Sequence, residues 1–260
     1  MSLENIAIVG ASGNLGALVL PVLLKSKLSL TAVIRETSSA KFPGSVKIVK
    51  SDFKLGSLTE AFKGQDAVIS MLPITALGDQ GVVIEAAIAA GVKRFIPSEY
   101  GSDSTTFFQG LTGFDLTTKT VTLVDGGKTR FTASTVAQIG RALIAVLSHA
   151  TETANRVVFV ESFTTTQLEV LTAVEEATGE KWKVVDANSK DIRAEGFKKM
   201  EEGNILEGGA ALIQAAVLGK EALEDHTHVK GGIWNDRLGL KQESVEEEVK
   251  RILQTATAKQ

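Results

Sequence analysis

The sequence feature that most constrains the fold is a glycine-spaced turn at the start of the chain. The apolar run Ile6–Val9 leads directly into this turn, which contains Gly10, Gly13 and Gly16. Glycines with this spacing, after a strand and before a helix, are typical of the dinucleotide-binding turn of an α/β sheet. We expect Gly10 to permit the tight turn, Gly13 to let the backbone approach a pyrophosphate, and Gly16 to let the helix pack near the strand.

The helix after the turn gives an electrostatic reason to expect phosphate there. The free N–H groups and the positive dipole end of a helix N-terminus attract anions. A purely structural tight turn is the alternative, because glycine serves that role in any fold. The predicted cofactor-binding residues of the turn are Gly10, Ala11, Ser12, Gly13, Asn14, Leu15 and Gly16.

Short apolar runs alternate with helical patterns through the first hundred residues. The predicted strands are Ile6–Val9, Leu30–Ile34, Val46–Val49, Ala67–Met71 and Arg94–Pro97. The predicted helices are Leu15–Leu24, in which Pro21 predicts a kink or a local break, Ser57–Phe62 and Gln80–Ala90. Repeated β–α units with apolar strands predict an α/β fold, a Rossmann-type doubly wound parallel sheet with helices on both faces.

The second half has a different pattern and predicts a smaller C-terminal α+β substrate domain. Residues 120–124 and 128–132 alternate around Asp125-Gly126-Gly127, which predicts a β-hairpin. The other predicted elements are strands at 156–160 and 181–185 and helices at 135–147, 164–176, 191–201, 207–218 and 244–256. We place a Rossmann domain, shortened after residue 103, at 1–119 and the smaller domain at 120–260. Whether strand 156–160 returns to the first sheet is left open.

Composition narrows the setting in which the chain acts. It has 260 residues, a formal net charge of −3 and no cysteine. The lack of cysteine excludes disulfides, thiolate metal sites and cysteine nucleophiles, and the charge balance predicts neither a nucleic-acid nor a membrane partner. The start of the chain lacks a signal-peptide pattern and no apolar run could span a bilayer, so we expect a cytoplasmic protein.

The end of the second strand predicts which nicotinamide cofactor the turn would hold. A carboxylate there hydrogen-bonds the ribose 2′-hydroxyl of NAD, whereas an arginine accommodates the 2′-phosphate of NADP. Arg35 stands at this position, and Lys41 offers a second positive charge. We therefore predict NADP(H), although Glu36 weakly favours NADH and a solvated Arg35–Glu36 surface pair is the alternative explanation.

Three further strand ends supply candidate site residues, because ligands of open α/β sheets bind outside the carboxyl ends of the strands. The end of the third strand is where adenine is expected, with a helix-entry turn as the alternative. The end of the fourth lies near the expected cofactor crevice, with core packing as the alternative. The cofactor-binding candidates there are Asp52, Phe53, Met71, Leu72 and Pro73, and the catalytic candidates after the fifth strand are Ser98, Glu99 and Tyr100.

The three histidines do not predict a metal site. His226 and His228 are separated by one residue, but only Glu224 and Asp225 nearby add further ligand atoms. A surface loop is the favoured interpretation, and we predict no metal. His149 is expected to interact with the terminal carbonyls of the helix before it.

Three motifs together resemble a known family. IVGASGNLG at 8–16, VIRETSS at 33–39 and GVKRFIPSEYGSD at 91–103 resemble the NmrA-like and isoflavone-reductase-like proteins, atypical short-chain dehydrogenase/reductases. The likeness to fungal members continues through 114–182, so it covers nearly the whole chain. The resemblance implies a Rossmann domain, a small C-terminal domain and bound NADP. It also implies that Gly10–Gly16 form the glycine loop and that Arg35 recognises the phosphate.

The chain departs from this family where the family's reductases carry a catalytic lysine, on a helix after the fifth strand. No lysine occurs between Arg94 and Lys119, and Lys119 does not match that position. A strand with its crossover helix needs at least ~10–12 residues, which leaves too little chain to reach the predicted hairpin. We therefore expect cofactor binding to be better preserved than catalysis.

Two functions stay open at this stage. The first is an NADPH-dependent reductase of a small aromatic or phenylpropanoid-like molecule, in which the cofactor carries the chemistry. The second is a non-catalytic NADP-sensing regulator that binds a protein partner, which the absent lysine favours. A shortened gene product, with exposed apolar surface and impaired folding, is a third interpretation.

Overall fold

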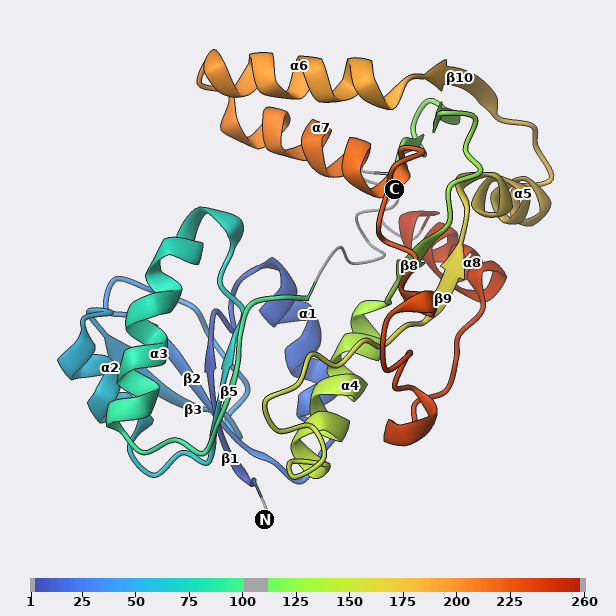
Figure 1. Ribbon diagram of the computed structural model, residues 1–260. Helices are drawn as coiled ribbons and strands as arrows, with labels where there is room; N and C mark the ends of the chain where they lie inside the picture. Colours follow the sequence, from blue (N-terminus) through green and yellow to red (C-terminus); the bar gives the residue numbers. More distant parts are fainter. Residues whose placement is uncertain (1–2, 101–111, 258–260) are drawn as a thin grey trace. The chain divides into compact units, whose positions relative to one another are not determined.

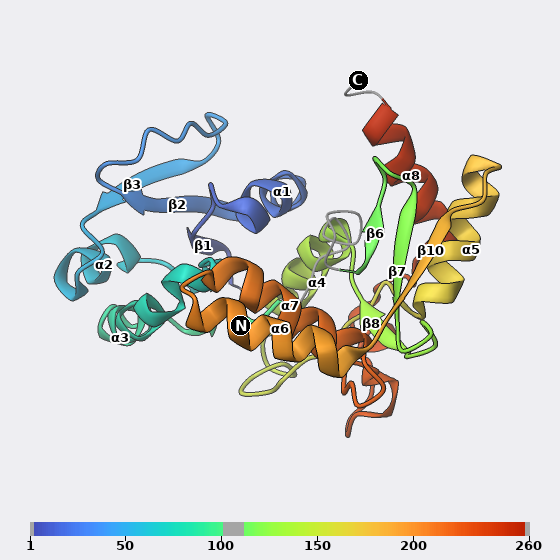
Figure 2. The same ribbon diagram turned by 90° about the horizontal axis from the view of Figure 1, so that it is seen from above.

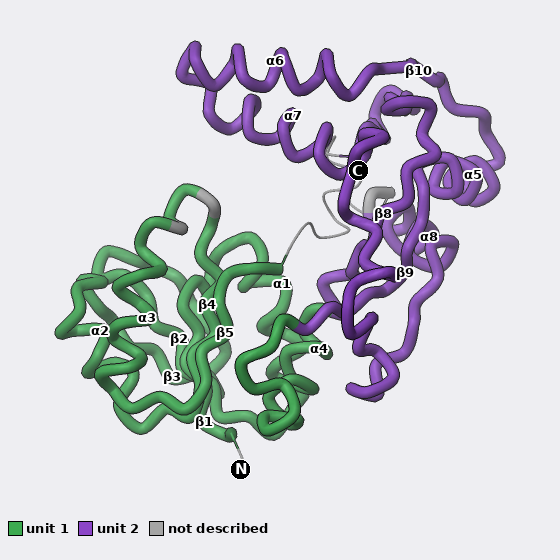
Figure 3. Tube along the Cα trace, viewed as in Figure 1, with its two compact units in different colours: residues 1–101, 139–157 green, residues 102–138, 158–260 purple. Residues whose placement is uncertain are grey.

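The computed structural model describes residues 3–100 and 112–257, and the chain divides into two compact units (Figures 1 and 3). The first unit comprises residues 1–101 and 139–157, and the second comprises 102–138 and 158–260. These units group residues 102–119 and 139–157 differently from the predicted domain boundary at residue 119. Each unit is described by itself.

The first unit contains a five-stranded parallel sheet with the strand order β3-β2-β1-β4-β5. This order is that of a Rossmann-type sheet, so the predicted fold class is confirmed. The strands are β1 Asn5–Val9, β2 Ser29–Arg35, β3 Lys47–Ser51, β4 Ala67–Ser70 and β5 Arg94–Ile96. The helices are α1 Asn14–Leu23, α2 Leu55–Phe62, α3 Gln80–Ala89 and α4 Val136–Ser148, whose first three residues are grouped with the second unit.

Helices cover both faces of this sheet (Figures 1 and 2). On one face, Val9, Val33 and Val68 of the strands form a core with Phe62 of α2 and Val83 of α3. Side chains alternate along a strand, so Ile6, Ile8 and Ile69 point to the opposite face, where α1 and α4 lie. Both faces are buried, which explains why the strands are continuous apolar runs.

Helix α1 runs through Pro21 without a break and ends at Leu23. The expected local break is therefore absent, because a proline in the last turn removes only one hydrogen bond before the helix ends anyway.

The chain returns to the first unit as a helix. In α4, a Cβ on Gly140 would lie 2.7 Å from Cβ of Val22 in α1, so the two helices cross closely at this glycine. Arg94 of β5 donates hydrogen bonds to the carbonyl oxygens of Ala150 and, at 3.0 Å, Thr153 after α4. The guanidinium thereby holds the end of α4 beside the strand.

The predicted strand 156–160 is wrong. These residues are described, form no strand and make isolated contacts instead, with the carbonyl of Phe159 accepting from N–H of Trp234 at 2.8 Å. Val157 is 72% exposed, so the apolar run connects the two units and is not a buried strand. Within residues 3–100 and 112–257, no strand pairs with the outer edge of β5.

The second unit contains two small sheets and a group of helices. One sheet has the order β10-β7-β6 and the other pairs β8 with β9. The strands are β6 Phe114–Asp115, β7 Thr120–Val124, β8 Phe131–Ala133, β9 Phe163–Thr165 and β10 Lys183–Ala187. The helices are α5 Gln167–Thr178, α6 Ser189–Glu201, α7 Ile205–Leu218 and α8 Val245–Thr257. The unit is of mixed α and β structure, as expected.

The predicted hairpin around Asp125 is wrong, because its two strands belong to different sheets. Strand β7 pairs in parallel with β10 on one edge and antiparallel with β6 on the other, so no edge is left for a hairpin partner. Asp125, in the predicted turn, contacts other segments instead. The carboxylate of Asp125 accepts hydrogen bonds from Oγ of Ser189 at 2.7 Å and N–H of Lys220 at 3.0 Å. It thereby connects the start of α6 and the segment just after α7 to the end of β7.

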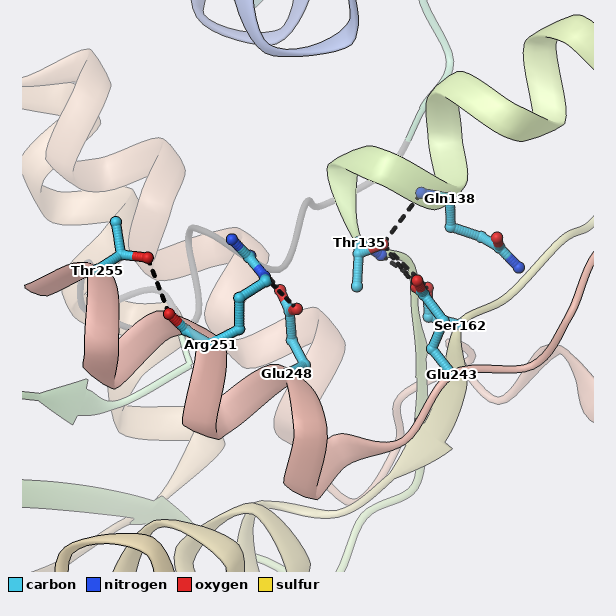
Figure 4. A network of polar contacts seen from close by, with 7 residues as sticks. All are labelled: Thr135, Gln138, Ser162, Glu243, Glu248, Arg251 and Thr255. Carbon is cyan, nitrogen blue, oxygen red and sulfur yellow. Dashed lines mark hydrogen bonds and ion pairs between the residues drawn. The ribbon is translucent and has the colours of Figure 1, made fainter. Parts of the chain in front are cut away.

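A buried polar network holds the C-terminal segment of the second unit (Figure 4). The carboxylate of Glu243 accepts from the hydroxyls of Thr135 at 2.6 Å and Ser162 at 2.5 Å. Thr135 also caps α4, since its Oγ1 accepts from N–H of Gln138 at 3.0 Å. The segment before α8 is therefore fastened to the start of α4 and to β9.

Asp66 stabilises the first unit in a pH-dependent way. Its carboxylate accepts from Nζ of Lys93 at 2.7 Å and from N–H of Asn5 and Glu4, both at 3.0 Å. The Lys93 hydrogen bond, followed by the amides, holds the pKa of Asp66 well below its usual value. The folded state therefore binds this proton less tightly than the unfolded chain, so the stabilisation is present above the unfolded pKa of about 4 and is lost as the pH falls below it.

We expect Asp66→Asn to lower the free energy of unfolding by about 1–3 kcal/mol at pH 7, because it removes a charged acceptor of several bonds. The difference from the unmodified protein should shrink between pH 5 and pH 3 in urea-unfolding measurements over ~pH 3–7. Glu85→Gln, on an exposed side chain of α3, is the matched control. A difference that does not change with pH would contradict the assignment.

Candidate functional site

The carboxyl ends of the five parallel strands meet at one edge of the first unit's sheet. Strands β1 and β4 are neighbours there although β2 and β3 lie between them in sequence. The strand order reverses at this point, which is where open α/β sheets bind their ligands. The glycine turn follows β1, so it lies at this reversal.

The glycine turn is built for close approach of backbone to backbone. Gly10 has φ +84°, and a Cβ there would lie 2.3 Å from the carbonyl oxygen of Met71 after β4. A Cβ on Gly16 would lie 2.2 Å from the carbonyl oxygen of Gly10, so α1 could not approach the turn with any larger residue. The structural roles predicted for Gly10 and Gly16 are confirmed.

The start of α1 has no side-chain cap. Gly13 is the residue before the helix, and no side chain caps it. Gly13 has φ −73°, and its N–H donates to the carbonyl of Gly10 at 2.9 Å. The side chains of Ser12 and Asn14 are exposed beside it, whereas Ala11 is buried and Leu15 is half-buried. An uncapped helix N-terminus at the end of a parallel strand is a site that favours an anion.

Arg35, at the end of β2, is held by two partners. Its Nη2 lies 3.2 Å from Oδ2 of Asp79, and its guanidinium carbon lies 4.9 Å from the centre of the Phe53 ring. The ion pair is with Asp79 and not with Glu36, so the alternative of an Arg35–Glu36 pair is wrong. Lys41 is exposed in the loop between β2 and β3, and no ion pair joins it to another residue within 3–100.

Asp52 and Phe53 have separate roles after β3. The carboxylate of Asp52 accepts from the N–H of Lys54 at 2.9 Å and from the hydroxyl of Ser57, which lowers its pKa. Asp52 therefore forms the helix-entry turn before α2. Phe53 has φ +62°, unusual for a bulky residue, and its half-buried ring lies against the core under the guanidinium of Arg35.

The chain just after β4, residues 71–73, approaches the glycine turn through its backbone. Met71 and Leu72 are buried, and Leu72 belongs to the core between the sheet and α3. Pro73 is exposed. The carbonyl of Met71 borders Gly10, so these residues lie next to the glycine turn, with Met71 and Leu72 packed in the core.

The segment after β5 is connected to the end of β4 and the start of α3. Oγ of Ser98 donates to the carbonyl of Leu72 at 2.8 Å, and its N–H donates to Oε1 of Gln80 at 2.7 Å. Glu99 is exposed, and its N–H donates to the carbonyl of Pro97 at 3.0 Å. Ser98 therefore lies next to the end of β4, and Glu99 is exposed to solvent.

Tyr100 carries a buried hydroxyl without a partner. Its Oη has no hydrogen bond to any residue that the structure describes, and burial raises its pKa. The phenol is therefore neutral, and burial makes it a weaker acid than a solvated tyrosine. The residues after it, 101–111, lie outside the described part of the chain, as does most of the segment where the family's lysine is expected.

Lys119 is used elsewhere. It lies between β6 and β7 in the second unit and forms an ion pair with Glu180.

His226 and His228 form a short helical turn capped by Asp225, and the His226 ring lies 4.7 Å from that of Phe159. Across residues 3–100 and 112–257, no three histidine, aspartate or glutamate side chains gather as a metal site would require. No helix in those ranges is long and apolar enough to cross a membrane.

Two residues that the sequence analysis did not single out join the start of α3 to the ends of β2 and β5. Asp79 pairs with Arg35, and its neighbour Gln80 accepts from Ser98. An aspartate before an apolar helix normally indicates a helix cap. No pattern in the sequence indicates that its carboxylate turns to a strand end 44 residues earlier.

The fold of the first unit is of the Rossmann type, and comparison with solved structures agrees. The crystal structure of an isoflavone reductase matches with a TM-score of 0.78 and 17% identity, over 96% of this chain and 99% of that one. The complex of leucoanthocyanidin reductase with NADPH from Vitis vinifera matches with a TM-score of 0.80 and 16% identity, over 96% and 100%. These two likenesses show a shared fold.

The sequence comparisons give the family. The model of the NmrA-like family matches residues 2–116. Oxidoreductase poxI of Penicillium oxalicum is 30% identical over 293 residues, covering 94% of this chain and 92% of poxI. The chain therefore belongs to the NmrA-like family of isoflavone-reductase-like oxidoreductases. The alignment is longer than the 260 residues of this chain, so poxI carries segments that have no counterpart here.

Proposed function

We propose that the protein is an NADP(H)-binding reductase of a small aromatic or phenylpropanoid-like molecule. The observation that carries the proposal is the combination of an uncapped α1 behind a crowded glycine turn with an arginine at the end of β2. The turn suits a pyrophosphate, and Arg35 with Lys41 suits a 2′-phosphate. The relatives named as reductases support the nicotinamide cofactor and the substrate class.

In this proposal the residues of the chain bind and orient, while the bound nicotinamide supplies the hydride. Gly10–Gly16 hold the pyrophosphate, Phe53 borders the adenine, and Met71–Pro73 border the crevice beyond the turn. Ser98 is fixed by Leu72 and Gln80, which suits a positioning role near the nicotinamide end. Tyr100 is the catalytic candidate that we favour over exposed Glu99, because its buried hydroxyl has no hydrogen-bond partner among the described residues.

A non-catalytic NADP-sensing regulator with a protein partner is the second candidate function. It is favoured by the absence of lysine between Arg94 and Lys119, and by the ion pair that commits Lys119 to Glu180. Both functions need the same cofactor site and differ in turnover. Incubation of the protein with NADPH and a panel of aromatic carbonyl and alkene substrates separates them. Consumption of NADPH supports the reductase, and binding without any turnover across the panel contradicts it.

Arg35→Ala tests the choice of cofactor. We expect it to weaken NADPH binding roughly tenfold and leave NADH binding nearly unchanged, because a charge-assisted contact to phosphate is worth about 1.5 kcal/mol. Both tryptophans, Trp182 and Trp234, belong to the second unit, so calorimetry is a more direct measurement than their fluorescence. An equal loss for both nucleotides would contradict a role for Arg35 in reading the 2′-phosphate.

A further inference from the structure

We propose that Asp79 tunes the cofactor affinity of this site by competing with the cofactor's 2′-phosphate for Arg35. This inference rests on the proposed binding of NADP(H). Its basis is the ion pair of 3.2 Å between Nη2 of Arg35 and Oδ2 of Asp79. A carboxylate and a phosphate bind the same N–H groups of a guanidinium, so they cannot both form their full set of hydrogen bonds with Arg35 at once.

The guanidinium is held in place by two elements. Asp79 precedes α3, and Phe53 follows β3, so Arg35 is fixed between them with its carbon 4.9 Å from the ring centre. This distance leaves no room for an adenine between the guanidinium and the ring. Arg35 must therefore shift from this position before adenine can stack on that face of Phe53.

The release of Asp79 from Arg35 is inexpensive. Asp79 ends the 3-10 turn Ile74–Asp79, which runs with helical backbone angles into α3, and its side chain makes no capping hydrogen bond that a shift would break. The side chains of Arg35 and Asp79 are 57% and 49% exposed, so their pair is weak. A dianionic phosphate outcompetes it, and Asp79 lowers affinity without blocking the site.

Asp79→Asn removes the competing charge and keeps a side chain of nearly the same size and shape. The experiment is calorimetric titration of the full chain with 2′,5′-ADP, which carries the 2′-phosphate, and with 5′-AMP, which differs from it only in lacking that phosphate. We expect Asp79→Asn to raise the affinity for 2′,5′-ADP about three- to tenfold and to change that for 5′-AMP less than about twofold. Glu85→Gln, exposed on the same helix, is the matched charge control and should change neither.

The double variant Arg35→Ala with Asp79→Asn tests whether the effect acts through Arg35. It should bind 2′,5′-ADP no better than Arg35→Ala alone, since the contested partner is gone. Unchanged or weaker binding of 2′,5′-ADP by Asp79→Asn, or an equal gain for both ligands, overturns the inference. If the unmodified protein prefers 2′,5′-ADP and Asp79→Asn binds 2′,5′-ADP with the same affinity, the inference fails and the proposed cofactor stands. If the unmodified protein does not distinguish the two ligands, both fail.

Discussion

Gly13→Ala should lower the affinity for NADPH about 30- to 100-fold while the protein stays folded. The added methyl group would stand beside the uncapped start of α1, where the pyrophosphate must approach the backbone. Losing two charge-assisted hydrogen bonds of the turn costs about 2–3 kcal/mol of binding, and about 1.4 kcal/mol corresponds to a tenfold change. Calorimetric titration of the variant and the unmodified protein measures the loss.

The fold should tolerate this change. Gly13 has φ −73°, which alanine adopts readily, and its Cβ would lie 3.2 Å from the carbonyl oxygen of Gly10 and 3.9 Å from that of Met71. We expect the free energy of unfolding to change by no more than about 1 kcal/mol. Gly56→Ala is the matched control, because a Cβ there meets nothing within 4 Å in α2. Unchanged NADPH affinity in Gly13→Ala would show that the turn is only structural.

Gly10→Ala should destabilise the first unit by about 3–5 kcal/mol, a large effect for one methyl group. Its φ of +84° costs an L-residue about 1–2 kcal/mol. In addition, the new Cβ would lie 2.3 Å from the carbonyl oxygen of Met71, so either the turn or the end of β4 must move. Urea unfolding followed by circular dichroism measures the change.

Gly64→Ala separates the two contributions. Gly64 has φ +75°, but a Cβ there meets nothing within 4 Å, so this variant should lose only the conformational part. The difference between the two variants then measures the crowding between the glycine turn and β4. Equal losses in Gly10→Ala and Gly64→Ala would mean that the close approach contributes nothing to stability.

The sequence predicts the first unit well because its elements are locally encoded. Strands buried on both faces become continuous apolar runs, and the glycine turn allows few other structures, so β1 to β5 lie close to their predicted positions. The capping box of Thr166 and Glu169 and the left-handed Gly179 likewise mark the ends of α5 in sequence. The candidate residues at the strand ends follow from this topology.

The failures concern partners distant in sequence. Residues 120–132 have the alternation of a hairpin, but β7 is taken by β10 about 60 residues later through the contacts of Asp125. The run 156–160 has the composition of a buried strand, but it connects the two units. Asp79 has the appearance of an ordinary helix cap, and only the fold brings Arg35 to it. Local patterns predict elements, whereas these contacts depend on how the elements assemble.

The affinity of the unmodified protein for NADPH and NADH is the most direct test of the central claim, that the edge between β1 and β4 is an NADP(H) site. We expect calorimetric titration to give tighter binding of NADPH than of NADH, by about tenfold, with Arg35→Ala removing the difference. Binding of neither nucleotide, or a preference for NADH that Arg35→Ala leaves unchanged, would contradict it.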